Sequence, residues 1–240
     1  MIDKQSPIPI YFQIEALIDK QIKDGVLRPG EALPSEREFA SEYGVSRMTI
    51  RQGITNLVQQ KKLYREKGKG TFVSWPNIEQ PLSKMTSFTE DMKNREMEPG
   101  SKLLSFNRVE ATGEIASILG ISEGTMVFAI KRVRLADHMP IALEQTYITC
   151  ELAPDLHEGV LHSSLYQYFE QECGYIINDA EQTIKAILAT SEDAALLEVE
   201  KGSPLLAIRR QARLEDNRVL EAVYSHYRGD RYHFVTKMSR

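Results

Sequence analysis

The chain has 240 residues, of which 42% are hydrophobic and 27% are charged, proportions typical of a soluble globular protein. The length allows one large domain or two modest ones. No apolar run approaches the ~20 residues of a membrane-spanning helix, and the first residues lack the basic-then-apolar pattern of a signal peptide. Cys150 and Cys173 are too few for a disulfide scaffold or a cysteine-rich metal site. We therefore expect a cytoplasmic protein with reduced thiols, no metal, no cofactor and no membrane partner.

The net charge of −4 is distributed unevenly along the chain. Residues 1–74 contain 12 Lys and Arg against 9 Asp and Glu, whereas residues 75–240 contain 18 against 25. Residues 47–73 carry seven basic residues and a single acidic one, Glu66. A basic stretch on an acidic chain is typical of a nucleic-acid-binding surface, although charge alone fits a solvated surface equally well.

The N-terminal part predicts three helices. Apolar residues at helical spacing indicate an amphipathic helix over residues 9–24. Ser35 and Glu38 form a capping box that begins a short helix. Ser46 is placed to cap a third helix, residues 47–60. Two short helices joined by a three-residue turn predict a helix-turn-helix.

Two short strand-like runs, 63–65 and 71–73, flank a basic tip that contains glycine, which predicts a wing. Residues 75–81 then contain two prolines and no hydrophobic period, as expected of a linker. The predicted organisation is a winged helix-turn-helix over 1–74, a linker over 75–84 and an effector-binding, dimerisation domain over 85–240.

The C-terminal part predicts an antiparallel sheet with helices, so the whole chain is of the α+β class. Strand-like runs lie at 102–109, 126–135, 141–149, 176–189, 204–214, 218–227 and 231–237, and helical runs at 112–119, 164–173 and 191–198. Asp216 and Asn217 indicate a hairpin turn, and residues 137–140 another.

A recognition helix places polar side chains in the major groove while its other face packs on the domain. On the predicted helix 47–60, Thr49 lies opposite the apolar stripe, and Arg47 and Arg51 stand one turn apart. Arginine can bridge guanine O6 and N7 or clamp a phosphate. In the wing, Lys69 is placed for a minor groove or for phosphates. The candidate DNA-binding residues are Arg37, Arg47, Thr49, Arg51, Gly68, Lys69 and Gly70.

In the predicted strand 126–135, Arg132 and Arg134 are two residues apart, so both point to one face. Paired arginines on one face can clamp a phosphate or a carboxylate. Ser164 begins a predicted helix whose N-terminus would favour the same anion. Glu221 and Tyr227 share a face of their strand. The alternative is that the two arginines form surface ion pairs with glutamates of a neighbouring strand.

Segments Leu33–Glu38, Ser46–Gln52 and Gly68–Val73 resemble the N-terminal domain of GntR-family regulators. The resemblance implies DNA contacts from the residues named above. There are two departures from the family pattern: Gly53 replaces the usual alanine, at a helix cost of ~1 kcal/mol, and Lys61-Lys62 replaces the usual acidic-glycine pair.

Segments Ser87–Met92, Arg132–Ala136 and Tyr227–Tyr232 are similar to the HutC-type branch of that family, whose effector (UTRA) domain is related in fold to chorismate lyase. Resemblance to the branch's repressors of amino-sugar utilisation implies an amino-sugar 6-phosphate ligand, such as N-acetylglucosamine 6-phosphate or glucosamine 6-phosphate. It implies that the phosphate is held by Arg132, Arg134, Ser164, Tyr166 and Thr89, and that the sugar is met by Phe88, Glu144, Glu221 and Tyr227. Arg228, Asp230 and Arg231 are interpreted as a structural salt-bridge cluster.

The sequence thus predicts a homodimeric repressor that binds double-stranded, palindromic operator DNA under the control of a small phosphorylated sugar. One alternative is a regulator of the same class with another carboxylate or sugar-phosphate effector. Another is a sensor that scaffolds a partner protein and binds DNA weakly. An enzyme like chorismate lyase is a remote third, because the five histidines show no metal-ligand spacing and no nucleophile motif is present, so we name no catalytic residue.

Overall fold

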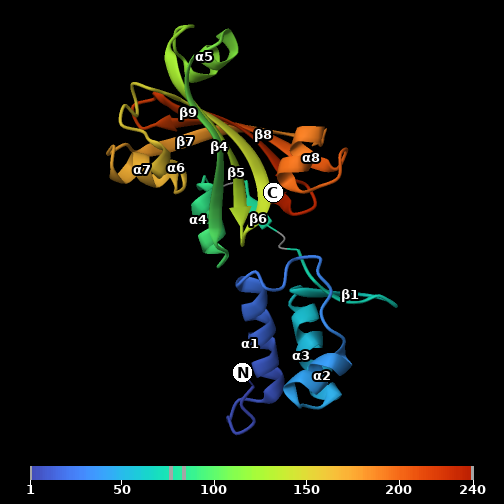
Figure 1. The fold of residues 1–240 in the computed structure, drawn as a ribbon. Helices are drawn as coiled ribbons and strands as arrows, with labels where there is room; N and C mark the ends of the chain where they lie inside the picture. Colours follow the sequence, from blue (N-terminus) through green and yellow to red (C-terminus); the bar gives the residue numbers. More distant parts are fainter. Residues whose placement is uncertain (1, 76–77, 83–84, 239–240) are drawn as a thin grey trace. The chain divides into compact units, whose positions relative to one another are not determined.

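A computed structural model describes residues 2–75, 78–82 and 85–238 of the chain (Figure 1). The chain divides into two compact units, Met1–Pro76 and Asn77–Arg240. Together they combine helices with an antiparallel sheet, which confirms the predicted α+β class.

The N-terminal unit contains three helices followed by a two-stranded hairpin. Its elements are α1 (Ile10–Lys23), α2 (Glu36–Tyr43), α3 (Arg47–Gln59), β1 (Leu63–Glu66) and β2 (Gly70–Val73). The predicted capping box is present, because the Ser35 hydroxyl accepts from the Glu38 N–H and the Glu38 carboxylate accepts from the Ser35 N–H. Gly44, in the left-handed conformation, ends α2 at the turn. Apolar side chains from all three helices and the hairpin form one buried core, so a winged helix-turn-helix is confirmed.

Helices α1 and α3 approach closely at Gly53. A β-carbon built on Gly53 would lie 3.1 Å from the carbonyl oxygen of Tyr11 and 3.2 Å from Cγ2 of Ile14. This crowding explains why glycine rather than alanine occupies the middle of α3. The tight contact between the two helices offsets the low helix propensity of the residue.

The turn after α3 contains the unusual Lys61-Lys62 pair. Lys61 adopts a φ of 59°, in the left-handed region that favours glycine. A residue with a β-carbon is therefore held in a strained backbone conformation at this position.

The C-terminal unit is built on a six-stranded antiparallel sheet with strand order β4-β5-β6-β9-β8-β7. The strands are β4 (Pro99–Glu110), β5 (Met126–Ala136), β6 (Met139–Thr149), β7 (Ile177–Leu188), β8 (Pro204–Leu214) and β9 (Val219–Arg228). Asp137 and His138 both have positive φ in the β5–β6 turn, and Asn217 does in the β8–β9 turn. These tight turns lie where the sequence predicted hairpins.

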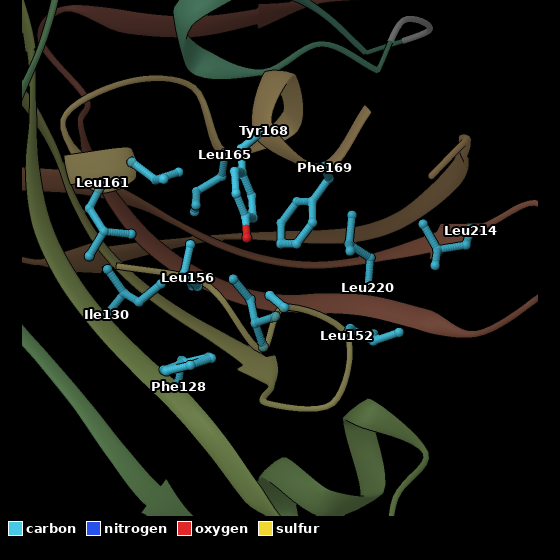
Figure 2. Packing of buried hydrophobic residues seen from close by; sticks show 13 residues of the cluster. Phe128, Ile130, Leu152, Leu156, Leu161, Leu165, Tyr168, Phe169, Leu214 and Leu220 are labelled. Atoms are coloured by element: carbon cyan, nitrogen blue, oxygen red, sulfur yellow. The ribbon is translucent and has the colours of Figure 1, made fainter. Parts of the chain in front are cut away.

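Helices cover both faces of this sheet. On one face lie α4 (Phe88–Asn94), α6 (Glu158–Leu161) and α7 (Leu165–Gln171). On the other lie α5 (Gly113–Leu119) and α8 (Ser191–Leu197). The largest apolar cluster lies between α6–α7 and the sheet, and it joins Phe169 of α7 with Phe128, Ile130 and Leu220 of the strands (Figure 2).

Three elements differ from the sequence predictions. Residues 78–81, inside the predicted linker, form β3 (Ile78–Pro81), which pairs in parallel with β10 (Tyr232–Val235). Four residues are too few to show a period, and the partner strand is remote in sequence. Helices α4 and α6 were not predicted. With four residues, α6 is too short for an apolar period. The signal for α4 was its capping box, formed by Ser87 and Glu90, which the sequence reasoning did not use. The predicted linker positions 76–77 and 83–84 lie outside the described residues.

Candidate DNA-reading surface and effector cavity

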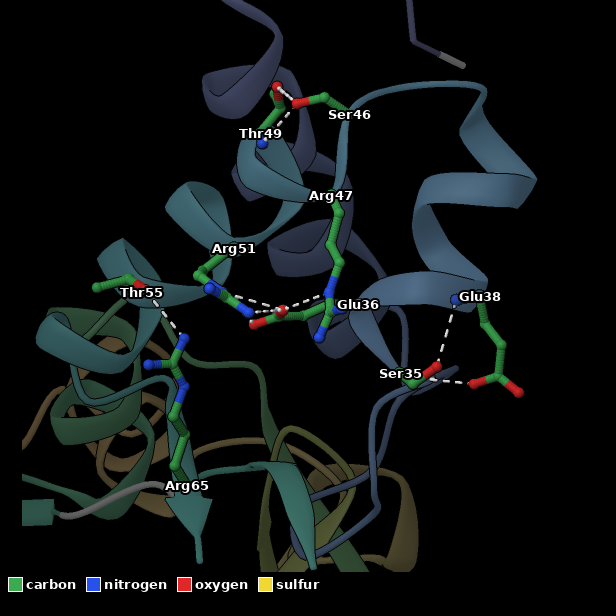
Figure 3. Close-up of polar contacts among 9 residues, drawn as sticks. All are labelled: Ser35, Glu36, Glu38, Ser46, Arg47, Thr49, Arg51, Thr55 and Arg65. Atoms are coloured by element: carbon green, nitrogen blue, oxygen red, sulfur yellow. Dashed lines mark hydrogen bonds and ion pairs between the residues drawn. The ribbon is translucent and has the colours of Figure 1, made fainter. Parts of the chain in front are cut away.

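The recognition helix α3 presents its predicted polar residues on the surface of the N-terminal unit. Arg47 and Arg51 both reach back to the carboxylate of Glu36, in the first turn of α2 (Figure 3). The Arg47 Nε lies 3.3 Å from Glu36 Oε2, and the Arg51 Nη2 lies 2.8 Å from the same oxygen. Hydrogen bonds from Arg51, together with the charges of both arginines, lower the pKa of Glu36, so this carboxylate is ionised at neutral pH. Arg37 is exposed on α2.

Thr49 is tied to the start of α3, because its hydroxyl lies 2.8 Å from the hydroxyl of the N-cap residue Ser46. Arg65, which the sequence analysis did not single out, donates from β1 to the Thr55 hydroxyl at 2.9 Å (Figure 3). This exposed guanidinium therefore lies against the recognition helix, a position that follows only from how the hairpin packs.

The wing tip requires its two glycines for conformation rather than for space. Gly68 and Gly70 have φ of 79° and 132°, and a β-carbon on either would meet no atom within 4 Å. Lys69, between them, is 74% exposed in its side chain and pairs with Glu66 at 2.8 Å. The wing thus presents an exposed cation at its tip.

The C-terminal unit contains a cavity between the sheet and the starts of α4 and α7. The empty space inside it is about 560 Å³, a figure that includes open solvent at its mouth. All nine residues that were expected to meet the effector line it, which brings together side chains from positions 88 to 227. They are Phe88, Thr89, Arg132, Arg134, Glu144, Ser164, Tyr166, Glu221 and Tyr227.

Arg132 and Glu144 form a buried ion pair on the cavity floor. They are directly opposite each other on β5 and β6, and Arg132 Nη2 lies 2.5 Å from Glu144 Oε1. Burial opposes ionisation of Glu144, but Arg132 and Arg134 lower its pKa below the usual value. The expected alternative, a pairing with a glutamate of the neighbouring strand, is therefore present for Arg132. However, it lies inside the protein and not on the surface.

Arg134 is buried with neutral partners. Its Nη2 donates to the Thr89 hydroxyl at 3.2 Å, and its guanidinium stacks 4.7 Å from the ring centre of Phe88. Within the described parts of the chain, no carboxylate lies at ion-pair distance from Arg134, and its Nε has no hydrogen-bond partner. Burial, with the charge of Arg132, lowers the pKa of Arg134 to about 10. Arg134 is therefore a buried cation that lines the cavity with no direct ion pair among the described residues, although the charge of Glu144 acts on it from a distance.

Glu221 and Arg210 add further charge to the cavity. Burial and the neighbouring Glu144 raise the pKa of Glu221 to about 7, so a large share of it is protonated at neutral pH. Arg210, from β8, donates to the Thr86 carbonyl at 3.3 Å and to Gln182 at 3.2 Å. The cavity therefore contains three arginines against one firmly ionised glutamate and one half-ionised glutamate, an excess of positive charge.

Several lining residues were missed by the sequence reasoning, namely Ser87, Thr146, Leu165, Ile208, Arg210, Val223 and Ser225. The strand alternation that selected Arg132 and Arg134 applies equally to Arg210 and Ile208 on β8. It did not show which face of β8 is turned to the cavity, because that depends on pairing with β9.

The interpretation of the C-terminal basic cluster as structural agrees with its geometry. Asp230 pairs with Arg228 at 3.0 Å and with Arg231 at 3.2 Å. The buried Arg228 also donates to the Leu197 carbonyl of α8. These contacts tie the end of β9 to α8.

Comparison with known proteins agrees with this architecture. Residues 10–73 match the model of the bacterial regulatory proteins of the gntR family, and residues 94–233 match the UTRA domain. The HTH-type transcriptional repressor NagR of Bacillus subtilis is 48% identical over 239 residues, which cover 100% of this chain and 98% of that protein. The chain belongs to the GntR family, with a UTRA effector domain.

Other relatives in the GntR family share the full architecture. The mannosyl-D-glycerate transport/metabolism system repressor MngR of Escherichia coli is 34% identical, with 95% of each chain covered. The crystal structure of PhnF from Mycobacterium smegmatis superposes with a TM-score of 0.67 at 30% identity, covering 94% of this chain and 99% of that one.

Membership of the GntR family makes this protein a DNA-binding transcriptional regulator, not an enzyme. The remote chorismate-lyase-like alternative is therefore set aside. In the described part of the chain, no helix is long and apolar enough to cross a membrane. No group of three metal-ligating side chains is gathered among those same residues.

Proposed function

We propose that this repressor acts as a cytoplasmic homodimer on palindromic operator DNA, and that an amino-sugar 6-phosphate in the UTRA cavity controls its affinity for that DNA. The observation that carries the effector proposal is the buried Arg134, which has neutral partners, an unpaired Nε and a depressed pKa. A bound anion would pair directly with this guanidinium.

The arrangement of groups favours a phosphate joined to a polar ring. Arg132 and Arg134 share one face of β5, and the Thr89 hydroxyl already contacts Arg134, so a phosphate is expected there. Glu144 and Glu221 lie on β6 and β9 in the same cavity, where their carboxyl groups can accept from sugar hydroxyls or pair with an amino group. The resemblance to repressors of amino-sugar utilisation favours the same ligand class.

Isothermal titration of the full-length protein with glucosamine 6-phosphate and N-acetylglucosamine 6-phosphate tests the effector. Free glucosamine and a simple carboxylate serve as comparison ligands. At 100 times its dissociation constant, a true effector stabilises the protein by about 2.7 kcal/mol in thermal unfolding. Binding of the carboxylate but of neither phosphate would show that the effector belongs to another chemical class. If neither sugar phosphate binds, the amino-sugar effector is refuted, while the assignment of the protein as a DNA-binding regulator is unaffected.

Operator binding is tested separately. A duplex selected from a random library by the full-length protein should be palindromic, and its complex should contain two protomers by sedimentation. We propose contacts from Arg37, Arg47, Thr49, Arg51 and Lys69, with close approach at Gly68 and Gly70. Each phosphate neutralised contributes a slope of about −0.9 in log K against log salt. An affinity that barely changes with salt would contradict these contacts.

A further inference from the structure

The N-terminal unit contains a carboxylate among the residues proposed to read DNA. Glu36 lies in the first turn of α2 and is within ion-pair distance of both Arg47 and Arg51 of the recognition helix (Figure 3). Its side chain is 20% exposed, whereas those of Arg47 and Arg51 are 63% and 46% exposed. An acidic group beside a DNA surface repels phosphates, so its presence there requires a physical reason.

The geometry of the Arg51 pair supplies that reason. Arg51 donates from Nε to both Glu36 oxygens, at 3.1 and 3.0 Å, and from Nη2 to Oε2 at 2.8 Å. The side edge of the guanidinium, made by Nε and Nη2, is therefore used by the carboxylate. The end edge, made by Nη1 and the second Nη2 hydrogen, takes no part in this pair. That edge is suited to the O6 and N7 acceptors of a guanine.

Holding one edge restricts the other. A free arginine side chain at a surface samples many rotamers, and ordering it on binding opposes association. A guanidinium already held in a fork by Glu36 loses less freedom when its end edge meets a base. The same contact partly neutralises Arg51 and Arg47, which weakens their attraction to the phosphates of any sequence.

We propose that Glu36 is a specificity-determining positioning residue, which orients Arg51 toward a guanine and reduces the attraction of Arg51 and Arg47 to arbitrary DNA. This inference rests on the proposed DNA contacts of Arg51 and Arg47. It assigns to an acidic residue a role in readout that a search for basic residues does not detect. The lowered pKa of Glu36 is consistent with a carboxylate that stays ionised under the conditions in which the repressor works.

The test compares Glu36→Gln with Glu38→Gln in the full-length protein. Both variants remove one negative charge from the first turn of α2. Glu38 instead caps Ser35, and glutamine also fits a capping box, so this variant is the matched control. Fluorescence anisotropy measures Kd for the selected operator and for a scrambled duplex of equal length. Thermal unfolding of both variants shows whether the fold is intact.

We expect Glu36→Gln to lower the ratio of operator affinity to scrambled-duplex affinity by about tenfold relative to Glu38→Gln, because a good bidentate base contact contributes ~1–3 kcal/mol of discrimination. Binding to the scrambled duplex should tighten or stay unchanged. An equal ratio in the two variants would overturn the inference.

A double-mutant cycle separates positioning from a general structural effect. If Glu36 acts through Arg51, the discrimination of Glu36→Gln combined with Arg51→Ala should equal that of Arg51→Ala alone. Additive effects would assign Glu36 an independent role and refute the proposed one. If the unmutated protein binds no duplex selectively, the proposed DNA contacts fail first, and that result is visible before any variant is compared.

Discussion

Replacing Arg134 with methionine should stabilise the UTRA unit and weaken effector binding at the same time. The pKa of Arg134 is lowered from 12.5 to about 10 by burial and by Arg132, which corresponds to ~3 kcal/mol by which the folded state disfavours the charged form. Both the folded and the unfolded protein carry this charge at pH 7, so the full destabilisation is present there. It would be relieved only as the pH rises through 10.

Methionine is unbranched and of similar reach, and it removes the charge without opening a large cavity. The substitution also removes the hydrogen bond to Thr89, the long hydrogen bond to Ser101 and the stacking on Phe88, which together contribute ~1–2 kcal/mol. The net gain is therefore about 1–2 kcal/mol, or roughly 3–6 °C in Tm for a unit of this size. Effector affinity should fall by about ten- to a hundredfold, because a charge-assisted contact contributes ~1.5–3 kcal/mol.

Calorimetric unfolding without ligand and isothermal titration with glucosamine 6-phosphate measure the two effects. Lys131→Met is the matched control, since Lys131 is a cation three residues before Arg134, on the opposite face of β5, where it pairs with Glu192. It should change Tm little and effector affinity not at all. A lower Tm for Arg134→Met would show that Arg134 stabilises the fold. An unchanged affinity for glucosamine 6-phosphate would show that the anion binds elsewhere.

Three further outcomes follow from other parts of the molecule. Arg51→Ala should weaken operator binding much more than binding to random DNA, whereas Lys69→Ala should weaken both similarly. Competition assays in which both variants lose affinity equally on every sequence would contradict base readout by Arg51. Because burial and Glu144 raise the pKa of Glu221 from 4.5 to about 7, the stability of the UTRA unit should fall by up to ~3 kcal/mol as the pH rises through that interval. Urea unfolding of Glu221→Gln should lack this part of the decline, and a profile parallel to that of the unmutated protein would refute it. Lys61→Gly should stabilise the N-terminal unit by ~1 kcal/mol, because glycine adopts the left-handed conformation without the strain of a β-carbon. A lower thermal midpoint for this variant would contradict the strain at Lys61.

Local signals in the sequence were sufficient for the N-terminal unit and for much of the cavity. The Ser35–Glu38 capping box and the spacing of apolar residues in α1 and α3 are encoded within a few residues, and the structure has these elements at the predicted places. Strand alternation placed Arg132 and Arg134 on one face. The start of α7 was placed at the same anion from the helix N-terminus at Ser164, whereas the convergence of side chains from α4 and β9 on this cavity came from family resemblance alone.

Strand register was beyond sequence reasoning. In the β5–β6 hairpin, a bulge shifts the register between Arg134 and Leu135. Counting back from the turn without the bulge would place Arg132 opposite Leu143 and would separate it from Glu144. Arg210 depends in the same way on how β8 pairs with β9, where another shift occurs. Such irregularities arise from packing of the whole sheet and cannot be predicted from the sequence of one strand.

The close approach of α1 and α3 at Gly53 has a consequence for engineered chimeras. Where a relative carries alanine at this position, the two helices must separate by a few tenths of an ångström to admit the extra methyl group, since the neighbouring atom is the Tyr11 carbonyl of the backbone. The recognition helix of such a relative would then lie slightly farther from α1 than it does in this protein. Replacing only the exposed side chains of α3 with those of a relative would transfer the base-contacting groups. It would not transfer the position of the helix on its domain. A faithful exchange of operator preference must therefore move α1 and α3 together.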